Sequence, residues 1–116
     1  MKDGIVWIAD QIFETLIAQT VHEHSKGLMH IDPPHPVMSF AYNYPQVNKF
    51  WMCNVKMPLD IVFCKSGKVS QIHHGEAHST RIIGSDDFSD LVVELPFGTV
   101  KKAGIKIGDP VELIKK

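Results

Sequence analysis

Two carboxylates in apolar, strand-like segments are the side chains of this sequence that most suggest chemistry. Asp60 lies in the segment 59–63 and Glu94 lies in the segment 91–95. Side chains alternate along a strand, so each carboxylate faces away from its large apolar neighbours. If the two groups are close together, they could act as an acid/base pair, since one negative charge raises the pKa of the other. The simpler interpretation is that each accepts hydrogen bonds from backbone or Asn groups, or faces water.

A second set of residues suggests a binding pocket rather than a reaction. Trp51 could serve as a stacking platform at a pocket mouth, with Asn54 and Asp60 as polar groups. An aromatic side chain with a few convergent polar groups is a common way to build a small-ligand site. Glu94 and Met29 complete this candidate binding site. The structural alternative is that Asn54 and Asp60 fix the turn at Met57-Pro58 through local hydrogen bonds.

Methionines and histidines offer two weaker candidates. Met29, Met38, Met52 and Met57 could form a soft surface for an adaptable partner, although such residues more often fill gaps in a core. Three imidazoles, from His73, His74 and His78, fall within six positions and are weak candidates for metal binding. No Glu follows His74 directly, so the His-Glu-x-x-His zinc motif is absent. We therefore expect no metal there and interpret this segment as a solvated loop.

Composition excludes several classes of function. The formal net charge is -1 and the chain has one Arg, Arg81, so clustered basic residues for a phosphate backbone or an anionic membrane are missing. The chain lacks a Gly-rich phosphate loop, a Gly-x-Ser-x-Gly elbow and a Cys-x-x-Cys pair, so nothing indicates a cofactor and there is no strong case for an enzyme. No stretch approaches the length of a membrane span or of a secretory signal. We therefore expect one soluble cytoplasmic domain over residues 1–116, which does not bind nucleic acid or membranes.

The two cysteines are too few for a disulfide scaffold. In a reducing cytoplasm we expect Cys53 and Cys64 to behave as small hydrophobic residues. A bridge between them requires Cα atoms within about 7 Å.

The pattern of apolar residues predicts a mainly β fold. Residues 4–18 fit either one amphipathic helix or two strands joined by a turn at Ala9-Asp10-Gln11. Thr20 and Glu23 form a capping box, which predicts a helix over 21–26 that ends at a left-handed Gly27. A second short helix is capped by Thr99 and ends at Gly104. Further strands are predicted over 37–42, 59–64, 69–73, 91–95 and 111–114, with a loop over 43–49 and a turn at Gly108-Asp109 after residues 105–107.

Several predicted strands carry apolar residues on both faces. This pattern favours a compact antiparallel barrel or sandwich of five to seven short strands with two short helices, a β-rich α+β fold.

Short segments of the chain match the pattern of one family. In order, they are Gly27-Leu28-Met29, Phe50-Trp51-Met52 with Asn54, Pro58-Leu59-Asp60, Gly67-Lys68-Val69, Val93-Glu94-Leu95-Pro96 with Gly98, and Gly104-Ile105-Lys106-Ile107-Gly108-Asp109. This ordered set spans roughly residues 18–111 and resembles the domain-of-unknown-function 192 family, also called uncharacterised protein family 0127. The resemblance implies a β-barrel-like fold and a strand over 12–18. His30 and Cys53 replace the Arg and Lys usual in the family, which weakens the idea of an anion site at those two positions. The family has no established activity that the resemblance could imply.

Three hypotheses about function follow from the sequence. The first is a small binding module with a pocket near Trp51, Asn54, Asp60 and Glu94. The second is a protein–protein interaction module that presents a methionine and aromatic surface. The third is a hydrolase that uses Asp60 and Glu94, which requires the two carboxyl groups to lie within about 10 Å of each other in a cleft. The sequence indicates no oligomeric state.

Overall fold

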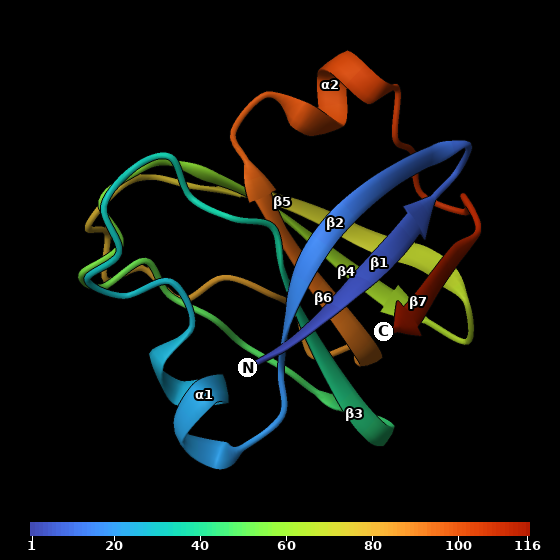
Figure 1. Cartoon of the computed structure of the whole chain (residues 1–116), viewed down its shortest axis with the longest axis horizontal. Coiled ribbons are helices and arrows are strands. Elements are labelled where there is room, and N and C mark those ends of the chain that lie inside the picture. Colours follow the sequence, from blue (N-terminus) through green and yellow to red (C-terminus); the bar gives the residue numbers. More distant parts are fainter.

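Seven strands and two short helices make up the chain in the computed structural model, which describes residues 1–116 (Figure 1). The strands are β1 (Lys2–Ile8), β2 (Gln11–Ala18), β3 (Met38–Val47), β4 (Leu59–Lys65), β5 (Lys68–Gly75), β6 (Phe88–Pro96) and β7 (Val111–Lys115). The helices are α1 (Val21–Lys26) and α2 (Thr99–Ala103). All seven strands join one sheet in the order β5-β4-β6-β3-β2-β1-β7, which confirms the mainly β fold class. Neither helix is long and apolar enough to cross a membrane.

The N-terminal segment is a hairpin and not a helix. Strands β1 and β2 pair antiparallel with Ile8 opposite Gln11, and Ala9 in the turn has a φ of 57°. Burial alternates along β1, where Val6 and Ile8 are buried and Trp7 is exposed. A helix would have placed Ile12 on the same face as Ile8, but its side chain is exposed. The strand prediction for residues 12–18 is therefore confirmed.

One strand pair departs from the antiparallel arrangement predicted from the sequence. Strands β2 and β3 run parallel, with Leu16 opposite Met38. A parallel pair needs a crossover connection, and α1 together with the proline-rich segment 32–36 supplies it. The crossover carries α1 to the lower side of the molecule in Figure 1, close to the end of β2.

The sheet curls strongly but is not a closed barrel. The edge strands β5 and β7 are not paired with each other along their length. They approach at one end only, where the Val111 N–H donates to the Gly67 carbonyl at 2.8 Å and the Val69 N–H donates to Asp109 at 2.9 Å. The two edge strands, β5 and β7, therefore lack a continuous ladder of hydrogen bonds between them.

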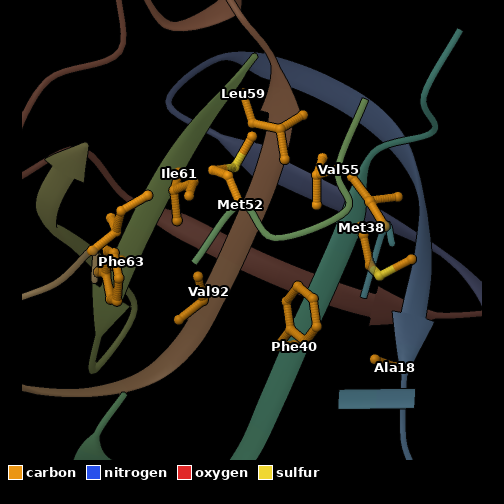
Figure 2. Packing of buried hydrophobic residues seen from close by; sticks show 11 residues of the cluster. Ala18, Met38, Phe40, Met52, Val55, Leu59, Ile61, Phe63 and Val92 are labelled. Carbon is orange, nitrogen blue, oxygen red and sulfur yellow. The ribbon is translucent and has the colours of Figure 1, made fainter. Parts of the chain in front are cut away.

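Apolar residues on both faces of β4 and β6 divide the buried residues into two clusters. The inner core, enclosed by the curl and capped by α2, contains Val6, Ile8, Val62, Cys64, Val69, Val93, Leu95, Val100, Ile105 and Val111. The outer core contains Ala18, Leu28, Met38, Phe40, Met52, Val55, Leu59, Ile61, Phe63, Ile83 and Val92. Figure 2 shows how Met52 and Val55, from the segment before β4, lie over the strands of the outer core. The first six residues of β4 are all buried because its two faces serve different cores.

Strand β3 is longer than predicted. Residues 43–47 were expected in a loop, but the strand continues to Val47. The register with β6 shifts between Ala41 and Gln46, and Pro45 lies inside this irregular stretch. Proline is tolerated at such a position because no ladder hydrogen bond requires its missing N–H. This extension carries the chain past Tyr42 towards the segment 46–51.

The two helices begin in different ways. At α1 the predicted capping box is present, since the Glu23 N–H donates to the Thr20 hydroxyl and the Thr20 N–H donates to the Glu23 carboxylate. Gly27 ends α1 with a φ of 49° and a ψ of −126°, outside the left-handed helical region that was expected. At α2 the predicted Thr99 cap is wrong, because Gly98 occupies that position and the Thr99 hydroxyl donates to the Pro96 carbonyl at 2.7 Å.

Candidate functional site

A cleft of about 710 Å³ opens between α1, β3 and the segment that follows β3. We call it the Glu94 cleft, after the one acidic side chain in its wall. It is lined by residues 21, 24–29, 40, 42, 46–51, 55 and 94. Its volume falls within the roughly 300–1,000 Å³ that small-molecule sites occupy in proteins.

Glu94 forms the floor of this cleft. It lies on β6 between Met38 of β3 and Ile61 of β4, and its side chain points towards the outer core. Only 4% of the residue is exposed. Above it the backbone of Gly27 passes without a side chain, and a methyl group at that position would lie 3.9 Å from Glu94 Oε1. The missing side chain of Gly27 thus leaves the carboxyl group open to the cleft.

The Glu94 carboxyl group has no partner within the protein. Burial raises its pKa to about 8, and no hydrogen bond or opposite charge lowers the pKa again. The group is therefore neutral near pH 7 and can donate one hydrogen bond as well as accept others. A buried polar group without a partner costs stability, so a role within the fold does not explain it.

Aromatic rings line the cleft around Glu94. Phe40 contacts Phe50 edge to face at a centroid distance of 5.0 Å, and His24 contacts Tyr42 in the same way at 5.1 Å. His24 is also fixed by a 2.9 Å hydrogen bond between its Nε2 and the Ala18 carbonyl. Burial raises the pKa of Tyr42 to about 12, with a smaller contribution from the nearby Glu94 charge. The wall thus consists of flat surfaces held in place by contacts with one another.

The mouth of the cleft carries Trp51 and two lysines. Trp51 is 45% exposed, so part of its side chain is free for contact with another molecule. Lys26 and Lys49 also line the cleft. The Lys49 ammonium lies 3.0 Å from Asp86, whose side chain is 94% exposed, so this ion pair contributes little.

Three of the five binding residues predicted from the sequence line the Glu94 cleft and two do not. Met29, Trp51 and Glu94 contribute to its wall. Asn54 does not line it, and its backbone adopts a φ of 59° while its carbonyl accepts a hydrogen bond from the His30 N–H at 2.9 Å. This bond is made by the Asn54 backbone and reaches His30, so it is not the local side-chain bond to the Met57-Pro58 turn that the structural alternative predicted.

Asp60 lies on the other face of the sheet and serves the inner core. Its carboxylate accepts hydrogen bonds from His74 Nδ1 at 2.6 Å, from the Gly98 N–H at 3.0 Å and from the Val100 N–H at 2.9 Å. The last two donors belong to the start of α2, so Asp60 caps that helix from a strand about forty residues earlier. The carboxyl groups of Asp60 and Glu94 point in opposite directions and do not share a cleft, which removes the basis of the hydrolase hypothesis.

The histidine and methionine candidates do not converge. His74 uses Nδ1 to bind Asp60, while His73 Nε2 contacts Gln71 at 2.9 Å. No three His, Cys, Asp or Glu side chains are arranged to hold a metal ion, His78 included. Met38 and Met52 are completely buried in the outer core, so the four methionines do not form a common surface. Cys53 and Cys64 are both free thiols.

Several residues of the cleft were missed by sequence reasoning. Tyr42 lies two positions beyond Phe40 on the same strand face, and both lie on the side of the sheet where Glu94 points. The predicted strand 37–42 already places both residues on one face, but no local pattern shows that Glu94 of β6 lies on the same side of the sheet. The contributions of His24 and Lys26 depend on how α1 packs, which no local pattern specifies.

These features define a small, mainly β domain with a cleft over the outer face of one curled sheet. The chain belongs to the DUF192 family, described as "Uncharacterized ACR", whose family model matches residues 5–113. This membership confirms the resemblance drawn from the sequence.

Two solved structures are similar to the whole chain. A protein of unknown function from Novosphingobium aromaticivorans is 29% identical, with a TM-score of 0.86 over 93% of this chain and 83% of that one. A Sinorhizobium meliloti protein described as a "putative transcription regulator" is 30% identical, with a TM-score of 0.88 over 97% of this chain and 93% of that one. No curated protein sequence matches the chain significantly.

Proposed function

We propose that this protein is a binding module that holds a small molecule in the Glu94 cleft. The observation that carries the proposal is the unpaired Glu94 carboxyl group, which is 4% exposed and lies at the floor of a cleft. The fully buried unpaired atoms of this chain are His35 Nδ1 and Gln71 Nε2, whereas the Glu94 carboxyl group reaches the cleft, where water can be its partner. A ligand that replaces this water would take over as the partner of Glu94.

The contrast with Asp60 supports this proposal. Both carboxylates come from adjacent central strands and are almost completely buried, with 0% of Asp60 and 4% of Glu94 exposed. Asp60 accepts three hydrogen bonds, two of which cap α2, so its conformational role is clear. Glu94 makes no such bond, and its raised pKa reflects burial alone. A residue that costs stability and positions nothing is typical of a site kept for function.

The shape and composition of the cleft also suit a small ligand. Phe40, Tyr42 and Phe50 provide flat apolar walls, and Trp51 can cover a ligand from the mouth. Nine of the seventeen lining residues are hydrophobic, and the polar groups among them could orient a ligand. A cytoplasmic location is part of the same proposal, supported by the free thiols of Cys53 and Cys64, since disulfides are rare in reducing compartments.

The chain offers a matched pair of tryptophans for a test. Trp51 at the cleft is 45% exposed, and Trp7 on β1 is 41% exposed and does not line the cleft. We expect some members of a fragment library to raise the melting temperature of wild type and of Trp7→Ala, but not of Trp51→Ala. Ligand at about one hundred times its Kd stabilises a folded protein by about 2.7 kcal/mol, which thermal shift measurements detect easily.

Amide spectra decide whether the variants fold and where the fragments bind. Unchanged peak dispersion would show that Trp51→Ala is folded, and fragment-induced shifts should map to α1, β3 and the segment 46–51. If no fragment stabilises the wild type, or if the shifts map to a different surface, the proposal is wrong.

A further inference from the structure

The Glu94 carboxyl group presents two unpaired atoms of different chemistry to the cleft. In its neutral form one oxygen carries a proton and donates, while the other oxygen only accepts. Neither oxygen is engaged by the protein, since burial is the sole influence on this group. Oε1 lies beneath Gly27, where a methyl group would reach van der Waals contact with it at 3.9 Å, and the glycine leaves that volume unfilled. A ligand that satisfies the whole group must therefore offer an acceptor and a donor side by side.

An amide edge meets this requirement. Its carbonyl oxygen accepts the carboxyl proton, and its adjacent N–H donates to the carboxyl carbonyl, which closes a ring of two hydrogen bonds. We propose that the Glu94 cleft recognises the amide or lactam edge of a flat, uncharged ring, with the ring held between the aromatic walls. This inference rests on the proposed binding function and names the class of its ligand.

The charges around the cleft argue against a cationic ligand. The titratable groups that line it besides Glu94 are His24 and Lys26 from α1, Tyr42 from β3, and Lys49 from the segment after β3. None of these groups is acidic near neutral pH, since the pKa of Tyr42 is raised to about 12. An amine that binds there would have to pass the Lys26 ammonium, since Lys49 is paired with Asp86, and would have to force Glu94 to lose its proton. An uncharged amide meets neither obstacle.

The aromatic walls favour a planar ligand. Phe40 is buried against Phe50, so the rings that a ligand can reach are those of Tyr42 and Phe50, which are partly exposed, and of Trp51, which is 45% exposed. Aromatic side chains gain most from rings that stack or meet their edges. A planar amide conjugated with an aromatic ring is therefore a better fit than a branched aliphatic amide of similar size.

Three isosteric fragments provide the test. Benzamide offers a donor and an acceptor, acetophenone offers only an acceptor, and the benzamidinium cation offers only donors. Amide shifts during titration of the full chain give a Kd for each fragment at the cleft. At about pH 6.5, where Glu94 is neutral, we expect benzamide to bind at least about tenfold more tightly than either analogue.

The dependence on pH provides a second measurement. As the pH rises from about 7 to about 9, the neutral fraction of Glu94 falls, so benzamide should lose about tenfold in affinity. Benzamidinium should gain affinity over the same range, because it pairs with the ionised carboxylate through two parallel hydrogen bonds. In Glu94→Gln, which keeps a donor and an acceptor at every pH, benzamide should bind without this loss.

The outcomes separate the two proposals. If benzamidinium binds more tightly than benzamide at about pH 6.5, or if Glu94→Gln shows the same loss of benzamide affinity with pH as wild type, the amide assignment is overturned. The same holds if other fragments bind the cleft and benzamide does not, and the binding function then survives. If no fragment of any class binds at the cleft, the binding function itself fails.

Discussion

Asp60 and Glu94 lie on adjacent paired strands, yet their side chains leave opposite faces of the sheet. In the register of β4 with β6, Glu94 lies opposite Ile61 and Asp60 lies opposite Leu95. Opposed residues share a face, so Glu94 points to the outer core and Asp60 to the inner core. One carboxylate therefore meets three donors and the other meets none, although the two segments look alike in the sequence.

The role of Asp60 as a remote helix cap predicts a large loss of stability when it is removed. In Asp60→Ala the N–H groups of Gly98 and Val100 lose their acceptor, and His74 loses its partner. We expect the free energy of unfolding, measured with urea, to fall by about 3 kcal/mol. The control Asp86→Ala removes an exposed carboxylate and should change it by less than about 0.5 kcal/mol. Similar values for both variants would argue against the cap.

Replacing Glu94 should raise the stability of the protein, by an amount that depends on pH. Burial raises the pKa of Glu94 in the folded protein to about 8, while its ordinary value is about 4.5. Below about pH 4.5 the group is neutral in both states, so Glu94→Gln and wild type should be similarly stable. Between the two pKa values only the unfolded chain loses the proton, so wild-type stability declines as the pH rises.

The Gln side chain of Glu94→Gln has no proton to lose, so this variant should keep its stability over that range. Near about pH 7 we expect it to be more stable than wild type by about 3 kcal/mol, measured by urea denaturation across the pH range. A constant difference between the two proteins at every pH would mean that ionisation of Glu94 is not the cause.

The substitution Gly27→Ala should both strain the backbone and fill part of the cleft. The φ of 49° with a ψ of −126° at Gly27 is a conformation that residues with a Cβ rarely adopt. In Gly27→Ala the new methyl group would lie 3.4 Å from the Phe40 ring and 3.9 Å from Glu94 Oε1. We expect a loss of about 2 kcal/mol in unfolding free energy together with weaker fragment binding at the cleft.

Gly104→Ala is a suitable control for the strain in Gly27→Ala. Gly104 also has a positive φ, of 69°, but a methyl group there meets no atom within 4 Å and lies away from the cleft. It should lose stability, by about 1 kcal/mol, with fragment affinity unchanged. Equal effects of the two substitutions on binding would show that the space beside Glu94 is not part of the site.

The two free thiols should differ in reactivity. Cys64 is buried, and burial raises its pKa to about 12, with a smaller contribution from the charge of Asp90. Because the thiolate is the reactive form, a thiol reagent at about pH 8 should label only Cys53 in the folded protein and both residues after denaturation. Mass spectrometry of the peptides measures this, and Cys53→Ser should remain unlabelled until it unfolds. Rapid labelling of Cys64 in the native state would contradict its burial.

Local patterns in the sequence predicted most of the fold. Alternation identified the strands around Ile61 and Val93, and the Thr20–Glu23 capping box identified the start of α1, because these signals act over a few residues. The parallel pairing of β2 with β3 was missed because it depends on where the crossover returns the chain. The cap of α2 was misassigned to Thr99 because its true acceptor, Asp60, is remote in sequence.

The candidate site was predicted only in part for a similar reason. Trp51, Met29 and Glu94 stood out by residue type, and all three line the cleft. Grouping Asp60 with Glu94 required knowledge of the register, since a change of one residue moves a side chain to the other face. The opening above Glu94 depends on the backbone of Gly27. Gly27 and Glu94 are far apart in the sequence, so no local pattern could predict that they lie close together.

Strand β4 has a consequence for how the molecule responds to perturbation. Its alternate side chains belong to the inner and outer cores, so both cores share this strand as a wall. Neither core can unfold while the other stays intact. Disruption of one cluster must therefore spread to the other, and the domain should melt as one cooperative unit. Amide protons of β4 should then be the slowest to exchange with solvent deuterium, on the timescale of complete unfolding. A ligand seated on Glu94 would slow that exchange on both sides of the sheet, including at α2, which it never touches.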